Sequence, residues 1–555
     1  MNKKVCSFPI LFALLALLIG TCAVVFPASA QAAPTSTGSI TVSGTVASSY
    51  DAYQIFSANV VDGDSDAKIA TDLAWASDAA RDAVLPVLHS AGMPNSQTTA
   101  QEAAEWLNTD SHLTGALSAQ LARSLQSSGA VSVALNAGTE AKLPCGYWLI
   151  VADDDAIAQG EAGTAPVMAL VGGSAVAVKP KAATPKVQKH VLEDSTAAWQ
   201  KAADATVADD LYWRLSATVP AGLTAYDTYT VRFVDTMSAG LDSSKVAASM
   251  RVYVAAGADG GFDAVPTGKD GRAGTKPAKG WTDITAQCAT KVAADGTFTV
   301  RTGDLIAVLG GVDAFTAGAR VVAVYNAPLN SACNHGIAKG NPNEVYLRYP
   351  RSPFADQSGD AGFTRTPSDD ACAYTWDLAL TKRGSDGDKP LAGAVLSITD
   401  DRVRTLAADG TWDAEGKATV TTGEDGRVTV SGVDSGKLEV RELKAPKGYT
   451  AFEGTRSVTV KAEGLDVDQV AAAKPKLTIT AESPLRADSA DGSTGSLEAS
   501  LINTPTGTPP SITTGGFMPS TGDMAMYAAA AAAVAGAALI VVALLVKRGG
   551  GSHKE

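Results

Sequence analysis

Alternation of apolar and polar residues predicts β-strands over much of the chain. The first third alternates over residues 38–60, and strand-like sequence returns at 145–153 and 168–178. Between them, residues 77–126 have helical spacing, and Thr99 with Glu102 has the pattern of a capping box. Leucines on one expected helix face recur every four residues at Leu113, Leu117, Leu121 and Leu125. The first third is therefore predicted to be an α+β domain with helical insertions.

The rest of the chain has the pattern of two β-sandwiches. Residues 187–353 and 374–504 carry β-branched alternating runs separated by Gly, Asp and Pro turns. The Pro- and Lys-rich stretch 179–186 marks a boundary before the first sandwich, and the acidic stretch 358–370 is predicted to separate the two. The fold class is therefore mainly β, with tandem Ig-like β-sandwich domains after the α+β domain.

The ends of the chain have the features of an exported and anchored protein. Lys3 and Lys4 precede an apolar stretch and a small-residue site at 28–30, as in a secretory signal. An apolar run at 524–546 is long enough to cross a bilayer, and basic residues follow it. The predicted parts are a signal peptide (1–30), an N-terminal domain (31–180), a middle domain (184–355), a C-terminal domain (372–505), a flexible tether (506–517) and a terminal sorting region (518–555).

Charge and cysteine content limit the partners, disulfides and metal sites that the chain can have. The net charge of −13 leaves no basic face for phosphates, so nucleic acid is not an expected partner. Four cysteines remain after the signal peptide, without metal-ligand spacing, and they allow three disulfide pairings. A Cys288–Cys333 disulfide is favoured because both lie in the middle domain, while Cys145 is compatible with a buried thiol. Neither a metal nor a cofactor is expected.

Three polar residues fall on apolar strand faces in the C-terminal domain. Period-two alternation places Lys382 on the apolar face of WDLALTK, Glu442 on that of KLEVRE and Asn503 on that of LEASLIN. Isolated buried charges cost several kcal/mol or more, so the three side chains should meet. Burial favours a neutral amine and a neutral acid.

A neutral amine, an acid and a carboxamide can react together. The Lys382 amine would attack the Asn503 carboxamide while Glu442 transfers protons, which forms an intramolecular isopeptide bond and releases ammonia. The alternative is an ordinary buried Lys–Glu ion pair with a hydrogen-bonded Asn. Parity alone does not separate these two interpretations.

The same region resembles a known family. The run LTKRG, PLAGAVLSI, GEDGRVTVSGV, KLEVRELKAPKGY and LINTP, followed by MPSTG, resembles the Cna-type (CnaB) domain that closes the major pilins of Gram-positive bacteria. YDAYQIF and GYWLI are similar to the pilin N-terminal domain, and TPKVQKHV, FVDTMSAGL, VYNAPLN and GNPNEVYLRY to its middle domain. The resemblance implies a self-formed crosslink between Lys382 and Asn503, with Glu442 as proton shuttle.

The middle domain departs from the pattern that the resemblance implies. Alternation turns Lys189 and Asp235 inward, but Arg351 stands where the family has the Asn that supplies the amide. Asn343 has the right parity, yet it lies about 26 Å away from that place along an extended strand. Lys189 and Asp235 are therefore expected to form at most an ion pair, with a Cys288–Cys333 disulfide as a compensating restraint.

The sorting region resembles the LPxTG signal of sortase substrates. It consists of Met518, Pro519, Ser520, Thr521 and Gly522, directly before the apolar span and the basic tail. The resemblance implies cleavage between Thr521 and Gly522 and transfer of Thr521 to an amine. Lys181, in a run similar to the pilin motif V-x-V-Y-P-K, is the preferred amine and Lys179 the second choice, since Lys179 takes the place of the Tyr.

These features predict a structural protein whose only chemistry is its own crosslinking. The chain is expected to be the backbone subunit of a sortase-assembled surface pilus, anchored to the cell wall after a transient membrane-bound precursor. Expected partners are other copies, companion pilins, pilus-type and housekeeping sortases, peptidoglycan and host surface ligands. A minor or basal pilin, or a singly anchored adhesin, is the alternative. An enzyme is disfavoured because H-E-x-x-H, a Walker loop and a nucleophile elbow are missing from the sequence.

Overall fold

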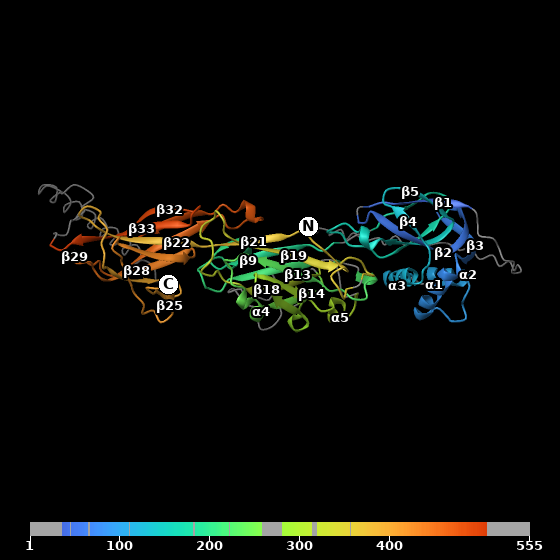
Figure 1. The fold of residues 1–555 in the computed structure, drawn as a ribbon, viewed down its shortest axis with the longest axis horizontal. Helices are drawn as coiled ribbons and strands as arrows, with labels where there is room; N and C mark the ends of the chain where they lie inside the picture. Colours follow the sequence, from blue (N-terminus) through green and yellow to red (C-terminus); the bar gives the residue numbers. More distant parts are fainter. Residues whose placement is uncertain are drawn as a thin grey trace, which may run out of the picture.

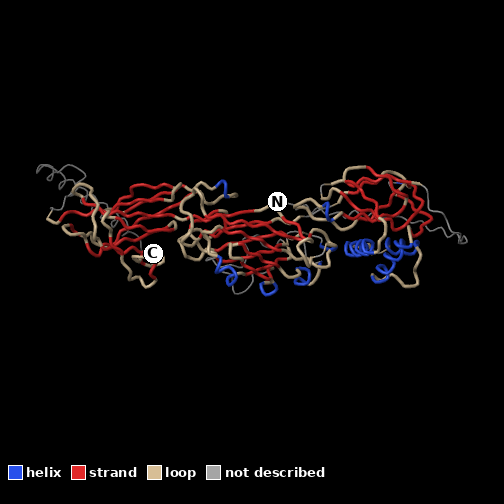
Figure 2. Tube along the Cα trace, in the orientation of Figure 1, coloured by secondary structure: helices blue, strands red, loops and turns tan. Residues whose placement is uncertain are grey.

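A computed structural model describes residues 36–44, 46–64, 67–109, 112–180, 184–220, 223–257, 280–312, 319–355 and 357–507. These residues form three domains that follow one another along an elongated molecule (Figure 1). Strands dominate, and the longer helices gather along the first domain (Figure 2). The structure confirms the mainly β fold class. The predicted signal peptide and sorting region lie outside the described residues.

The first domain joins two small sheets to three helices. Its sheets have the orders β5-β1-β8 and β3-β2-β6-β7, and β4 pairs with β2. Helices α1 to α3 pack on the larger sheet through a core that includes Ile55, Val84 and Leu121. The elements are β1 (Thr37–Val42), β2 (Ser49–Asp62), β3 (Lys68–Trp75), α1 (Asp78–Ser90), α2 (Ala100–Asn108), α3 (Gly115–Ser127), β4 (Ser132–Asn136), β5 (Glu140–Pro144), β6 (Gly146–Ala152), β7 (Val167–Val171) and β8 (Val176–Val178).

The helical region agrees with its sequence pattern except at one leucine. The capping box is present at α2, where Thr99 and Glu102 bond each other's backbone N–H groups. In α3, Leu117, Leu121 and Leu125 are buried as predicted. Leu113 is 37% exposed because the helix begins only after its N-cap, Thr114, whose hydroxyl accepts a bond from Leu117 N.

The middle domain is a sandwich of two sheets. One sheet has the order β10-β9-β12-β18-β14-β15, and the other β11-β21-β19-β13-β17-β16 with β20 on β19. The elements are β9 (Val187–Glu193), β10 (Ala198–Gln200), β11 (Ala202–Asp204), β12 (Tyr212–Thr218), β13 (Arg232–Met237), α4 (Val246–Ser249), β14 (Arg251–Ala255), β15 (Trp281–Asp283), β16 (Ala289–Val292), β17 (Thr297–Arg301), α5 (Leu305–Leu309), β18 (Arg320–Asn326), β19 (Asn341–Pro350), β20 (Phe363–Arg365) and β21 (Asp369–Tyr374).

The acidic stretch 358–370 does not separate the sandwiches as the sequence suggested. Strand β20 lies within it and β21 begins in it, and both pair antiparallel with β19. The middle sandwich therefore continues to Tyr374, beyond its predicted end at residue 355. An acidic residue enters this sheet because its charge is compensated: the Asp369 carboxylate contacts the Lys201 amine and accepts a hydrogen bond from Lys189 N.

The third domain is a second sandwich. Its sheets have the orders β27-β22-β33-β29, with β32 on β33, and β25-β24-β23-β28-β30-β31, with β26 on β23. The first strand, β22, and the last, β33, run parallel side by side. The elements are β22 (Trp376–Gly384), β23 (Val395–Thr399), β24 (Thr405–Leu406), β25 (Trp412–Asp413), β26 (Val420–Thr421), β27 (Arg427–Val433), β28 (Gly436–Lys444), β29 (Tyr449–Thr450), β30 (Thr455–Glu463), β31 (Lys476–Ala481), β32 (Leu485–Asp491) and β33 (Ser496–Pro505).

Specific contacts connect the middle domain to the third domain. The buried carboxylate of Asp204 accepts hydrogen bonds from Trp376 Nε1 at 2.6 Å and from Ser435 N at 2.9 Å. Gly336 approaches the loop before β33 so closely that a Cβ atom there would lie 2.5 Å from Gly495 N, and its φ of 76° also favours glycine. The contact between these two domains therefore consists of close backbone packing as well as hydrogen bonds.

Candidate functional site

The three inward polar residues of the third domain meet in its core. Lys382 lies on β22 and Asn503 on β33, which are neighbours in one sheet, while Glu442 lies on β28 of the facing sheet. Each strand is apolar on the same face, so period-two alternation directs all three polar groups between the sheets. The side chains of Lys382 and Glu442 are fully buried, and Asn503 is 2% exposed.

Direct contacts link the amine, the acid and the carboxamide. Lys382 Nζ donates to Asn503 Oδ1 and lies 3.0 Å from Glu442 Oε1. Asn503 Nδ2 donates to both Glu442 oxygens, at 2.9 and 3.1 Å, and Phe452 N donates to Oε2 at 3.1 Å. The amine therefore contacts the carbonyl side of the carboxamide while the acid contacts its nitrogen.

Burial changes the protonation of the amine. It lowers the pKa of Lys382 from 10.5 to about 8, against the opposing attraction of Glu442. At pH 7 such an amine is neutral more often than an exposed lysine amine. A neutral amine has a lone pair with which it can attack a carbonyl carbon. The environment thus raises the nucleophilic fraction of the amine.

A second buried polar cluster lies in the middle domain. Lys189 on β9 forms an ion pair with Asp235 on β13, and both side chains are fully buried. Lys189 Nζ also donates to the hydroxyl of Tyr325 at 2.9 Å, and that hydroxyl donates to Asp235 at 3.2 Å. Asn343 Nδ2 donates to the same hydroxyl at 2.9 Å. The tyrosine hydroxyl therefore stands between the amine and the carboxamide.

This arrangement corrects the position expected for the nearest amide. In the pairing of β13 with β19, Asp235 lies opposite Val345, which is two residues from Asn343. Asn343 therefore lies near the Lys189–Asp235 pair. Arg351 lies beyond the end of β19, where its guanidinium donates to Asp154 O of the first domain at 3.0 Å. The expectation that position 351 would supply the amide partner of Lys189 was therefore wrong, because that position lies at the contact between the first two domains.

Burial shifts both charges of the middle cluster toward neutrality. It lowers the pKa of Lys189 to about 8 and raises the pKa of Asp235 to about 6, while the attraction between the two groups opposes both shifts. Asn343 is fully buried and its Oδ1 has no hydrogen-bond partner. The cluster has the residue types of the third-domain site but not the direct amine–carboxamide contact.

The predicted disulfide is not present. Cys145, Cys288, Cys333 and Cys372 are all free thiols. Cys288 follows a short helical turn at 285–287 and lies next to Gly303, whereas Cys333 lies beside His335 in the segment between β18 and β19. Membership of one domain was too weak a criterion, since it does not bring two thiols into bonding geometry.

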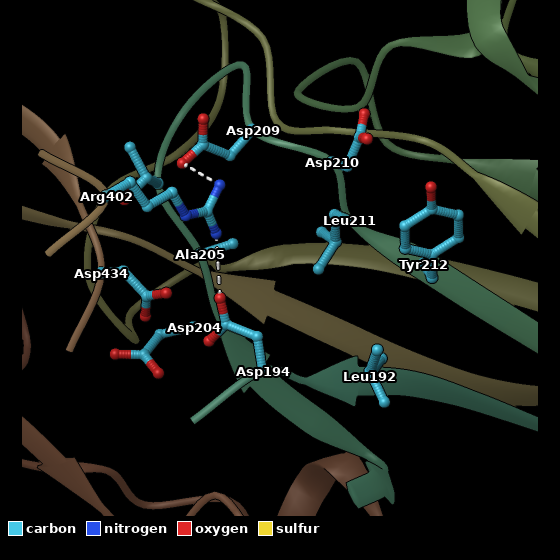
Figure 3. A pocket seen from close by; sticks show the side chains of 11 residues that line it. Leu192, Asp194, Asp204, Ala205, Asp209, Asp210, Leu211, Tyr212, Arg402 and Asp434 are labelled. Atoms are coloured by element: carbon cyan, nitrogen blue, oxygen red, sulfur yellow. Dashed lines mark hydrogen bonds and ion pairs between the residues drawn. The ribbon is translucent and has the colours of Figure 1, made fainter. Parts of the chain in front are cut away.

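An acidic pocket of about 300 Å³ lies between the middle and third domains (Figure 3). Arg402 points into it and forms ion pairs with Asp194 at 3.1 Å and Asp209 at 2.8 Å. Burial, followed by the charge of Asp204, raises the pKa of Asp434. The sequence did not indicate this pocket, because its acids lie on distant segments of both domains and have no common motif.

The remaining predicted site residues are only partly described. Lys179 is exposed directly after the edge strand β8. Lys181 and the five residues of the sorting signal lie outside the described residues. Within the described part of the chain, none of the helices is long and apolar enough to cross a membrane. In the same residues, His, Cys, Asp and Glu side chains form no group suited to holding a metal ion.

One family model matches most of the third domain. Residues 377–474 match the family model described as SpaA, prealbumin-like fold domain. This stretch starts in β22, contains Lys382 and Glu442, and ends before β31. This part of the third domain is therefore similar to the SpaA-type prealbumin-like fold domain.

Individual relatives are pilus and surface proteins of Gram-positive bacteria. The chain is 30% identical over 143 residues to the trypsin-resistant surface T6 protein of Streptococcus pyogenes serotype M6, and the match covers 24% of each chain. The solved T6 backbone pilin of that serotype is 17% identical, with a TM-score of 0.47, over 85% of this chain and 98% of that one. The full-length major pilin SpaD of Corynebacterium diphtheriae is 15% identical, with a TM-score of 0.43, over the same shares.

Proposed function

We propose that this chain is the backbone subunit of a covalently polymerised surface pilus whose third domain crosslinks itself. The observation that carries the proposal is the buried contact of Lys382, Glu442 and Asn503. The match to a SpaA-type domain and the motifs shared with major pilins support it. The protein is then structural, and the crosslink is the reaction that this function requires.

The geometry suits amide exchange. Lys382 Nζ attacks Asn503 Cγ to form the new C–N bond, and the carboxamide nitrogen leaves as ammonia. Glu442 contacts both nitrogens, so it can accept a proton from the amine and deliver one to the leaving group. The reacting groups are held together by the fold, which removes most of the entropic cost of bringing them together.

The bond would lie in the path of a pulling force. Force enters the third domain at the start of β22 and leaves at the end of β33. With Lys382 joined to Asn503, the covalent path between these ends skips the residues between them. A domain crosslinked in this way cannot be extended by force, which is the mechanical requirement of a pilus shaft.

The middle cluster is proposed to remain noncovalent. The Tyr325 hydroxyl takes the place next to Asn343 that an attacking amine would need. Intact mass tests both domains together: loss of one ammonia from the exported chain is expected, mapped to a branched peptide of Lys382 and Asn503. No loss would overturn the crosslink, and a second loss would show that Lys189 reaches Asn343.

Polymerisation is proposed to join Thr521 of one subunit to Lys181 of the next. Co-expression with a pilus-type sortase should produce a ladder of multimers that resists detergent. Lys181→Ala should abolish the ladder, and Lys179→Ala is the matched control that should preserve it. A ladder that persists in Lys181→Ala would reject that lysine, and a monomer under all conditions would favour a singly anchored adhesin or basal pilin.

A further inference from the structure

A thiol, an imidazole and a carboxylate lie in a row where the middle domain meets the third. Cys333 and His335 belong to the segment between β18 and β19, and Asp377 belongs to β22. Cys333 Sγ is 3.6 Å from His335 Nε2, and His335 Nδ1 is 2.8 Å from Asp377 Oδ2. One ring nitrogen therefore contacts the thiol, and the other lies within ion-pair distance of the carboxylate without forming a hydrogen bond to it.

Surrounding contacts hold this row in place. Gly336 N donates to Thr375 O at 3.1 Å, which fixes the segment carrying His335 beside β22. Oδ1 of Asp377 accepts a hydrogen bond from Ser431 Oγ at 2.6 Å, so that Oδ2 is the oxygen that faces the imidazole. The three groups come from two domains, so their alignment depends on the packing of the middle domain against the third.

We propose that Cys333 is a nucleophilic cysteine that exchanges with small disulfides, with His335 as its base and Asp377 as the carboxylate whose charge stabilises the protonated imidazole. A nucleophile next to a base, with a carboxylate close enough to stabilise the protonated base, is an arrangement that can activate a thiol. This site is separate from the crosslinking residues and does not depend on the proposed pilus function.

The thiol needs the imidazole to react. Burial, and then the negative charge of Asp377, raise the pKa of Cys333, so the thiolate is not preformed. His335 Nε2 is positioned to accept the thiol proton as the sulfur attacks. Reactivity should therefore follow the presence of His335 and not the exposure of the sulfur.

The proposed reaction is disulfide exchange. Cys333 Sγ attacks one sulfur of a small disulfide, a new S–S bond forms, and the old bond breaks. The departing thiolate takes the proton from His335 and leaves as a thiol. Small disulfides are the expected co-reactants outside the cell, where conditions are oxidising.

Acyl transfer fits the site less well. It would require N–H donors for an oxyanion. Cys333 N already donates to Asn330 O at 3.1 Å, and Asn334 N donates to Asn341 Oδ1 at 2.8 Å. Exchange at sulfur develops no such oxyanion, so it is the reaction that these residues can support.

Cys288 provides a control within the same molecule. It is more exposed than Cys333, but burial of its sulfur raises its pKa to about 12 and its contact is the backbone of Gly303. The full chain would be treated with dipyridyl disulfide, and the occupancy of each cysteine followed over time by peptide mapping. Cys333 should react at least about tenfold faster than Cys288.

Variants separate a chemical role from a structural one. His335→Gln should slow Cys333 by about a hundredfold and leave Cys288 unchanged, since general bases contribute about that much or more. Asp377→Asn should lower the rate at Cys333 less and change its pH profile. Equal or faster reaction of Cys288, or an unchanged ratio of the two rates in His335→Gln, would overturn the proposal. Cystine, tested in the same way, shows whether the exchange extends to a natural disulfide.

Discussion

Replacing Glu442 by Gln tests the crosslink most directly. Gln has nearly the same shape and can still contact Asn503, but it cannot carry the proton that leaves the amine. The Glu442→Gln chain should therefore keep its ammonia and show the mass of the uncrosslinked protein. Its third domain should also unfold at a lower denaturant concentration than that of the parent chain.

The size of the stability loss follows from two contributions. Lys382 and Asn503 are 121 residues apart, and closing a loop of that length restricts the unfolded chain by about 5 kcal/mol in the loop-entropy estimate. Removing the acid also leaves Lys382 buried without its ion partner, which costs about 3 to 5 kcal/mol more. Asn503→Ser prevents the crosslink but keeps the ion pair, so it should lose mainly the first contribution.

The assay is intact mass combined with urea unfolding followed by Trp fluorescence, because Trp376 is fully buried in the third domain. Glu439→Gln is the matched control, since Glu439 lies on the same strand but is exposed beside Lys437. It should lose ammonia normally and change stability by less than about 1 kcal/mol. Complete ammonia loss in Glu442→Gln would refute the reasoning, because the acid would then be unnecessary.

Three further predictions concern the middle domain and the joints. Burial, followed by the charge of Asp204, raises the pKa of Glu193, so the folded state keeps a proton that the unfolded chain has already lost. Stability should therefore fall as pH rises from the unfolded pKa of Glu toward neutrality, and Glu193→Gln should flatten that slope in urea unfolding. Tyr325→Phe removes the hydroxyl that contacts three buried polar groups. It should lower the free energy of unfolding by about 1 to 3 kcal/mol, measured by thermal unfolding. An unchanged transition would show that the hydroxyl does not stabilise the cluster. Arg351→Ala removes a hydrogen bond to Asp154 of the first domain. It should speed proteolysis between the first and middle domains without altering the loss of ammonia. Identical proteolysis would show that Arg351 does not stabilise the contact between these domains.

Strand pattern predicted the third-domain site well because side-chain direction in a strand is a local property. Alternation alone placed Lys382, Glu442 and Asn503 on inward faces, and the cost of burying isolated charges implied that they meet. The same reasoning turned Lys189 and Asp235 inward in the middle domain. Parity gives no information about the register between neighbouring strands. For that reason the amide near Lys189 was sought at position 351, whereas the structure places Asn343 there.

Contacts that depend on register or on two domains could not be predicted from the chain. Asn343 became the neighbour of Tyr325 through the pairing of β13 with β19 and the packing of one sheet on the other. The disulfide expected for Cys288 and Cys333 failed for the same reason, since sharing a domain does not set a distance. The acidic stretch was read as a spacer because its compensating lysine, Lys201, lies far away in sequence.

Local sequence pattern was enough to predict the mainly β fold class, the inward faces of the strands and the three residue types that meet in the core of the third domain. These follow from local periodicity and from the cost of burying charge. Packing of the folded chain places Tyr325 between Lys189 and Asn343, and it places Arg351 in a contact between domains. It also brings Cys333, His335 and Asp377 into one row. Such contacts depend on strand register and domain docking, which arise from packing of the whole chain and leave no periodic signal in any one segment.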